Sequence, residues 1–281
     1  LPIELLVLII NKLSWNSLHT WSFIDKRRRN AALPRLFHTA KFTFSNHGFQ
    51  SLNTLATSEL AWHVRTLHYE ASELFDPLIQ KWDYFAACVY TPQEYVRDQR
   101  ELHPRDILSY SGIQSYLSLI SQEQCALLEN RDDTGKFSDA ISRFPRLKSL
   151  KASFTGLQDH SMLWFSNRMF VGWDKSFPLY LETVFKAIIK MQSAGLLLKT
   201  IEINGFYAKL SSADDSLLNM ASTALASVSK IHLADSSSLL QFLSHIHLPS
   251  LEYVSLAKCS LISSDLRRFL VNSGGVRSLH L

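Results

Sequence analysis

Histidines, cysteines and acidic residues are the side chains of this chain that could do chemistry, and their spacing does not favour catalysis. His245 and His247 form a close pair of the kind that can bind a metal, but no acidic or cysteine ligands accompany them in that segment. Asp159 and His160 are adjacent, which is not the geometry in which an acid orients a histidine base. We therefore expect no metal, no cofactor and no catalytic residues.

Motifs of the common enzyme classes are also missing. The sequence contains no GxxxxGK, GxGxxG, GxSxG or HExxH pattern. The three cysteines, Cys88, Cys125 and Cys259, lie far apart, without the spacing of a zinc site and too few for a disulfide framework. These features predict a non-enzyme in a reducing, intracellular compartment, in the cytoplasm, the nucleus or both.

Length and composition set the outer bounds of the fold. With 281 residues, 46% of them apolar, the chain can form one large core or two smaller ones, and no segment approaches a membrane span. The formal charge of +4 comes largely from residues 26–29. Such a run can be a nuclear address or contact nucleic acid, but the lack of interleaved aromatic residues favours the solvated end of a short helix. We predict neither a nucleic-acid nor a membrane partner.

The first element that we expect to carry function is a helix at the N-terminus. Pro2 suits the first turn of a helix, and residues 5–10 form an unbroken apolar run that extends round the whole helix. A signal peptide or membrane anchor is the alternative, but Glu4 stands where a basic region is expected, and Asn11 and Lys12 end the run early. Three short helices cannot cover so much apolar surface, so another polypeptide is expected to pack there.

The order of residues in this block resembles the F-box, a three-helix module that binds the Skp adaptor of Skp-cullin-F-box ubiquitin ligases. The matching residues are Leu1, Pro2, Glu4, Leu5, Leu6, Ile9 or Ile10, Leu13, Ser17, Leu18, Ile24, Lys26, Arg28, and Ala31 or Ala32. The block departs from the family pattern near the third helix, where many members carry Cys or Ser before the Lys and an aromatic residue after it, whereas this chain has Asp25 and Arg28. The resemblance implies that the chain binds Skp, and through Skp a cullin. It implies Skp contacts by Leu1, Pro2, Leu5, Leu6, Ile9, Leu13 and Leu18.

After this block, units of the form apolar-x-x-apolar-x-apolar recur. They occupy residues 64–69, 147–152, 198–203, 228–233, 251–256 and 276–281, and the later ones are about 20 to 30 residues apart, as in leucine-rich repeats. Each unit predicts a short strand with alternate side chains facing inward, and residues 179–193, 237–245 and 264–272 have the helical spacing expected between strands. Cys259 falls where these repeats place Asn or Cys to hold the turn after the strand.

Two stretches do not follow the repeat. Residues 73–143 form an expected helical insertion, with helices beginning near Pro92 and near Ser121 to Glu123. The aromatic tract 159–175 is either a partly exposed loop or a core wedge, and core is favoured. The predicted fold class is α/β: an F-box at residues 1–36, then an irregular leucine-rich-repeat solenoid at residues 37–281, with a curved parallel sheet and helices outside. Because the sequence stops within a repeat strand, we expect the repeats to continue past residue 281.

The whole chain resembles fungal-type F-box proteins with divergent repeats, which implies a non-catalytic substrate receptor for ubiquitin-dependent degradation. Strand alternation places a set of side chains on the concave face that we expect to contact an unidentified target protein. The candidates are Lys151, Glu202, Lys230, His232, Tyr253 and His280. Without an arginine cluster, this face predicts no strong preference for a phosphorylated target. The alternatives are a repeat scaffold outside any ligase and a nucleic-acid binder with strongly salt-dependent affinity.

Overall fold

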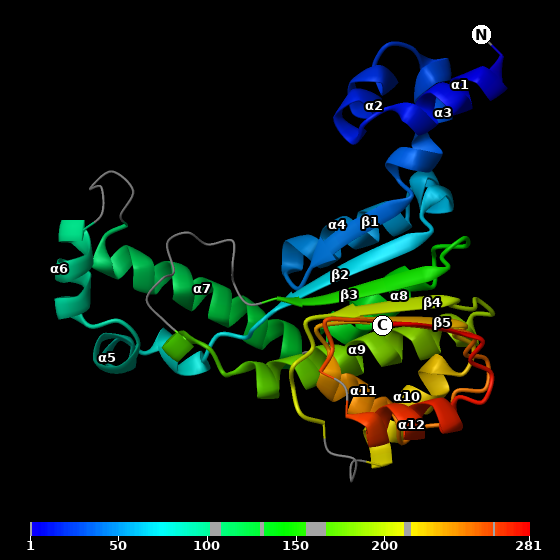
Figure 1. Cartoon of the computed structure of the whole chain (residues 1–281). Helices are drawn as coiled ribbons and strands as arrows, with labels where there is room; N and C mark the ends of the chain where they lie inside the picture. Colours follow the sequence, from blue (N-terminus) through cyan, green and yellow to red (C-terminus); the bar gives the residue numbers. More distant parts are fainter. Residues whose placement is uncertain (1, 102–107, 130–131, 156–166, 211–214, 261) are drawn as a thin grey trace.

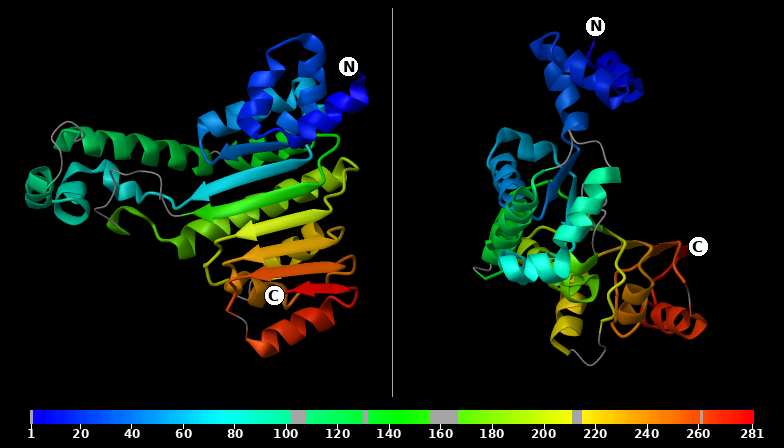
Figure 2. Two further views of the ribbon diagram at one scale, coloured as in Figure 1. Left: turned by 45° about the horizontal axis from the view of Figure 1, so that its top comes forward. Right: turned by 90° about the vertical axis from the view of Figure 1, so that its left-hand side faces the viewer.

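The computed structural model describes residues 2–101, 108–129, 132–155, 167–210, 215–260 and 262–281. Over these residues the chain is a mixed α/β protein with twelve α-helices and one seven-stranded parallel sheet (Figure 1). The strands are β1 (Thr39–Thr43), β2 (Thr66–Ser72), β3 (Ser149–Thr155), β4 (Thr200–Asn204), β5 (Lys230–Ala234), β6 (Tyr253–Ala257) and β7 (Ser278–His280). Each strand pairs with the next one in the chain, as Figure 2 shows, so the predicted α/β class and parallel sheet are confirmed.

Helices fill the connections between the strands. The helices are α1 (Ile3–Lys12), α2 (Trp15–Ser22), α3 (Lys26–Leu36), α4 (Asn46–Ala56), α5 (Trp82–Tyr84), α6 (Pro92–Glu101), α7 (Tyr110–Glu129), α8 (Asp132–Ile141), α9 (Trp173–Ser193), α10 (Asp215–Leu225), α11 (Ser237–Leu243) and α12 (Ser263–Asn272). Helices α9 to α12 lie on one side of the sheet (Figure 1). The main core lies between them and the inward side chains of the strands, such as Leu150, Ile201 and Ile231.

All six predicted strand segments contain a strand, and a repeated hydrogen-bond pattern aligns them. The carbonyl of Arg65 accepts the N–H groups of Lys148 and Ser149, at 2.9 and 3.0 Å. The same pair of hydrogen bonds, from two successive N–H groups to one carbonyl, recurs at the carbonyls of His38, Lys148, Lys199, Ser229 and Glu252. Each unit therefore begins in the same way against the unit before it. Strand β1 was not predicted, although Phe37, Ala40 and Phe42 have the same spacing as Val64, Leu67 and Tyr69 of the next unit.

The turns after β4, β5 and β6 also repeat. Gly205, Asp235 and Lys258 each follow the last residue of a strand and have φ of 72°, 49° and 53°. Next in the chain come Phe206, Ser236 and Cys259. The hydroxyl of Ser236 is 2.8 Å from the Ala234 carbonyl and accepts the N–H of Phe206 at 3.0 Å. The Cys259 sulfur is 3.5 Å from the equivalent carbonyl of Ala257, in line with the turn-holding role expected of it.

Replacing Ser236 by alanine is expected to destabilise the fold by about 2 kcal/mol, because the buried N–H of Phe206 would lose its acceptor. The measurement is the midpoint of urea unfolding. Cys259→Ser is the control: a serine hydroxyl can make to the Ala257 carbonyl the bond that the Ser236 hydroxyl makes to the Ala234 carbonyl, so the change is expected to leave the midpoint nearly unaltered. Equal losses in the two variants would contradict this account.

The insertion is helical, as expected, and has a separate small core. Helix α6 begins at Pro92, which confirms one predicted start. The predicted start near Ser121 is wrong, because Ser121 lies in the middle of α7. Its hydroxyl accepts a hydrogen bond from the Gln80 side chain at 3.2 Å, and Gln124 accepts the Phe75 N–H at 2.8 Å. These polar side chains join α7 to residues 75–80 instead of capping a helix.

Part of the aromatic tract 159–175 lies outside the described residues, which resume at residue 167. In the described part, Met169 is buried with Phe75 and Phe85 in the core of the insertion, whereas Trp173 at the start of α9 is exposed. Helix α9 begins earlier than the predicted residue 179 and contains Pro178 near its start. Pro178 is the sixth residue of α9, past the first-turn positions whose N–H groups have no partner, so the helix lacks one i→i−4 hydrogen bond there.

Candidate functional site

The first candidate site is the surface of the N-terminal unit, which consists of α1, α2 and α3 and stands beyond the β1 edge of the sheet (Figure 1). Its core is small: Ile10, Leu18 and Ala32 are buried together, with Leu13 and Trp21 packed against them. Helix α3 leads into β1 and contacts the short 3₁₀ helix η1 (Glu59–His63). The unit therefore has its own core, separate from the main one.

Helix α1 presents an uncovered aliphatic stripe. Leu5, Leu8 and Ile9 are 44%, 61% and 39% exposed. They are spaced i, i+3 and i+4, which places them on one face of the helix. Leu6 and Ile10 lie on the adjoining face of the helix and are almost fully buried. We call Leu5, Leu8 and Ile9 the α1 stripe. Large aliphatic side chains left exposed together on one helix are typical of a protein-binding surface.

The sequence-derived set of Skp contacts divides in this structure. Leu5 and Ile9 belong to the α1 stripe, and Pro2 is exposed as the residue before α1. Leu6 and Leu18 are 3% and 1% exposed, so they hold the unit together and present no surface to a partner. Leu13 is half-buried against the unit's core, and Leu1 lies outside the described residues. Leu8, the most exposed of the α1 stripe, was not among the predicted contacts.

Helix α2 carries an aromatic stripe that sequence reasoning missed. The Trp15 ring stacks on His19 with centroids 5.5 Å apart, and His19 meets Phe23 edge-on at 4.9 Å. Both Trp15 and Phe23 are largely exposed. Their i, i+4, i+8 spacing was the available signal. The N-terminal unit thus exposes large apolar side chains from two helices.

The basic run 26–29 is the exposed first part of α3, as predicted for a solvated helix end. Asp25 caps the helix by accepting the Arg28 N–H at 2.7 Å, and its carboxylate lies 3.3 Å from the Arg28 guanidinium. The guanidinium also lies over the Trp21 ring at 5.7 Å. Arg28 therefore makes contacts within its own unit.

The second candidate site is the face of the sheet opposite α9 to α12. The strand register aligns its outward side chains in rows, one of which joins Lys41, His68, Lys151, Glu202, His232, Ser255 and His280. These residues alternate with buried apolar ones, and they are polar or titratable along the whole row. We call this surface the polar sheet face. It contains all six predicted target-contact residues.

Charges on the β1–β4 half of the polar sheet face neutralise one another. Lys41 pairs with Glu70 at 2.7 Å, and His68 lies 3.7 Å from the same carboxylate. Lys151 pairs with Glu202 at 2.7 Å, and Glu202 also accepts a hydrogen bond from Asn204 at 3.0 Å. These hydrogen bonds hold the pKa of the Glu202 carboxyl below its usual range against the opposing effect of burial. Two of the predicted contacts, Lys151 and Glu202, are thus partners of each other.

Burial lowers the pKa of two histidines on this face, His68 and His232, because an imidazolium is less well solvated there. The Glu70 carboxylate opposes the shift at His68, and Glu202 opposes it at His232. His68 also contacts the Ser153 hydroxyl at 2.9 Å. Both rings therefore favour the neutral form in the folded protein.

We expect stability to fall as the pH drops below about 6.5. The unfolded chain takes up protons on these histidines near 6.5, whereas the folded chain takes them up only at lower pH. The contribution of the two neutral histidines to the free energy of unfolding is therefore fully present above the unfolded pKa, and it is lost as the pH falls through that value. The test is urea unfolding between pH 8 and pH 5.5 with a His68→Gln variant, which should show a weaker pH dependence. Gln50→Ala, at an exposed residue of α4 that does not titrate, is the control and should keep the wild-type dependence. An unchanged dependence in His68→Gln would contradict the assignment.

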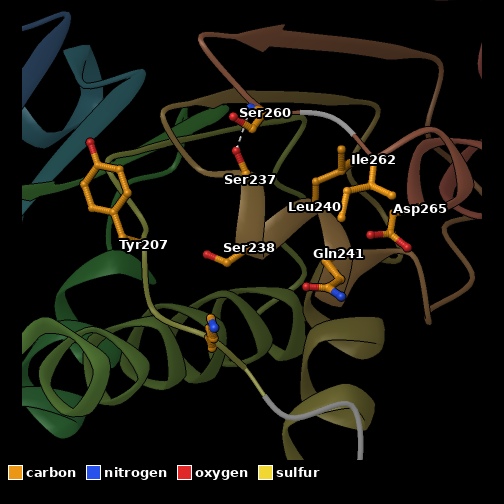
Figure 3. Close-up of a pocket in the computed structure, with 9 residues that line it drawn as sticks. Tyr207, Ser237, Ser238, Leu240, Gln241, Ser260, Ile262 and Asp265 are labelled. Carbon is orange, nitrogen blue, oxygen red and sulfur yellow. Dashed lines mark hydrogen bonds between the residues drawn. The ribbon is translucent and has the colours of Figure 1, made fainter.

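A pocket of about 310 Å³ lies beyond the carboxyl ends of β4, β5 and β6 (Figure 3). Tyr207, Leu240 and Ile262 supply apolar walls, and Lys209 and Asp265 line it as well. A hydrogen bond of 2.8 Å from the Ser260 N–H to the Ser237 hydroxyl joins two of its loops. Its volume is at the lower end of the range of small-molecule pockets. None of the predicted site residues lines it.

Neither a metal cluster nor a membrane helix is found in the described ranges. Nowhere in them do three His, Cys, Asp or Glu side chains gather to hold a metal ion. None of the helices in the same ranges combines the length and the hydrophobicity needed to cross a bilayer. No protein-family model matches the chain, and no curated protein matches its sequence.

Proposed function

We propose that this chain is the target-recognition subunit of a Skp-cullin-F-box ubiquitin ligase in the cytoplasm or nucleus. The N-terminal unit would bind Skp, and residues 37–281, as a leucine-rich-repeat solenoid, would bind the target. The chain would do no chemistry itself. It would hold target lysines near a ubiquitin-loaded conjugating enzyme and so raise their effective concentration.

The observation that carries the Skp assignment is the α1 stripe. Three neighbouring aliphatic side chains are exposed on a helix whose own unit buries very few residues. Desolvating such side chains against a partner is favourable by about 25 cal/mol for each Å² of apolar surface. Burial of the α1 stripe in an apolar groove of a partner is therefore more favourable than its exposure to solvent.

The sequential parallel sheet supports the solenoid assignment. A pair of hydrogen bonds to one carbonyl recurs before each of the strands β2 to β7, and a residue with positive φ follows each of β4, β5 and β6. Such recurrence is expected where equivalent units stack on one another. An open polar sheet face then offers a long surface to a protein target.

The test is direct binding of the purified intact chain to a purified Skp-cullin complex. We expect a stable complex by size-exclusion chromatography and dissociation in the submicromolar range by titration calorimetry. Failure of a folded chain to bind would contradict the proposal. It would leave the second candidate, a protein-interaction scaffold outside any ligase, which the polar sheet face supports without the α1 stripe.

A further inference from the structure

The β5–β7 part of the polar sheet face differs from the rest in the balance of its charges. Its outward residues on β5 include Lys230 and His232, those on β6 include Tyr253 and Ser255, and β7 adds His280. Among the described outward residues of these three strands there is no carboxylate. We call Lys230, His232, Tyr253 and His280 the basic aromatic cluster.

Aromatic contacts hold the basic aromatic cluster together. The Tyr253 ring lies 5.2 Å from the His232 ring on one side and 5.0 Å from the His280 ring on the other. The Lys230 ammonium lies 6.0 Å from the centre of the Tyr253 ring. Ser255, Ala234 and Ala257 occupy the adjoining positions of β5 and β6 and have short side chains. Cationic and aromatic groups thus form one continuous surface over three strands.

The nearest acidic residue on the polar sheet face is already engaged. Glu202 is the register partner of His232 on β4, but its carboxylate oxygen bonds Lys151 and Asn204. Glu252 precedes β6, so alternation directs it away from the side of the sheet that Tyr253 occupies. Hence Lys230 and the two imidazoles have no carboxylate to hydrogen-bond within the described chain.

We propose that the basic aromatic cluster binds an acidic segment of a protein, in which Asp or Glu side chains contact Lys230, His232 and His280. Charge complementarity selects this occupant. Lys230 is the cluster's one permanent cation, which is too few for the phosphate backbone of a nucleic acid. The cluster also lacks the guanidinium fork that favours phosphate groups, so carboxylates are the better match.

Binding of carboxylates should be linked to proton uptake. Glu202 on β4, Lys230 on β5 and Tyr253 on β6 are the titratable or charged groups around His232, and burial lowers the pKa of the ring in the free protein. A bound carboxylate would favour the imidazolium form, so affinity should rise as the pH falls from 8 to 6. Glu side chains of the ligand stay ionised over this range.

The inference rests on the proposed function only in naming the acidic segment as part of a ubiquitination target. It is tested by fluorescence anisotropy of the full chain without Skp. The probe is a labelled peptide of repeating Glu-Gly-Ser, and its match is repeating Gln-Gly-Ser. We expect the Glu peptide to bind at least about tenfold more tightly, and several-fold more tightly at pH 6 than at pH 8. Skp binding measured separately distinguishes failure here from failure of the proposed function.

Variants locate the site. Lys230→Gln and His232→Gln should each weaken Glu-peptide binding by about fivefold, the loss of one partly screened charge contact. Lys190→Gln is the control, because this exposed lysine belongs to α9 on the other side of the sheet, and it should leave binding unchanged. Unfolding midpoints of all three variants check the fold. Equal binding of both peptides, no effect of the cluster variants, or tighter binding of a single-stranded oligonucleotide through the same residues would each overturn the proposal.

Discussion

The double change Leu5→Asp with Leu8→Asp should abolish binding to Skp while the N-terminal unit stays folded. Both side chains are exposed in the free chain, so charging them costs the fold little. In a complex they would be desolvated, and each buried aliphatic anchor is worth on the order of 2 kcal/mol. We therefore expect the double variant to lose roughly a thousandfold in affinity for Skp, measured by calorimetry or by co-purification.

The matched control is Leu119→Asp, because this side chain is 65% exposed and belongs to α7, a helix of the insertion outside the N-terminal unit (Figure 1). It should leave Skp affinity unchanged. Leu6→Ala gives the opposite contrast, since it removes a buried side chain and should lower the unfolding midpoint. If the Asp pair binds Skp as wild type does, the α1 stripe is not the docking surface.

The largest effect on stability is expected from Gly205→Ala, at the turn after β4. Gly205 has a φ of 72°, a region that costs other residues about 1 kcal/mol or more. A Cβ there would also meet the backbone carbonyl of Phe154 at the end of β3, closer than Cβ atoms approach in real structures. Because a backbone carbonyl cannot move aside as a flexible side chain can, we expect a loss on the order of 3 kcal/mol in urea unfolding.

Gly195→Ala separates the two causes. Gly195 has a similar φ of 79°, but a Cβ there would meet nothing within 4 Å. This variant should cost only the conformational term of about 1 kcal/mol. Similar losses at both glycines would show that the close approach of β3 contributes nothing.

Local patterns were sufficient to predict much of the fold. Residues 147–152 and 198–203 contain strands because their alternating apolar residues specify which side faces a core. Residues 237–245 and 264–272 correspond to helices α11 and α12, because their apolar residues recur at helical intervals. The error at Ser121 has a different origin. Its polar group is satisfied by Gln80, which is distant in sequence, so a local capping pattern was misleading.

The candidate sites depended more on partners distant in the chain. The apolar run 5–10 predicted an uncovered helix, yet the run itself did not indicate which side would be covered. Packing of α1 and α2 against α3 decides that, and it places Leu6 and Leu18 inside while Leu5 and Leu8 remain outside. A helix has no fixed inner face until its neighbours are in place.

The sequence by itself determined that this chain has an apolar N-terminal helical block followed by repeating strand units, because both follow from side-chain spacing within short segments. Only the tertiary structure decided which charges neutralise one another. Lys151 meets Glu202, whereas Lys230 and His232 are left beside Tyr253, because the register of parallel strands sets these neighbours. That register comes from stacking whole units, and residues 51 positions apart become adjacent through it.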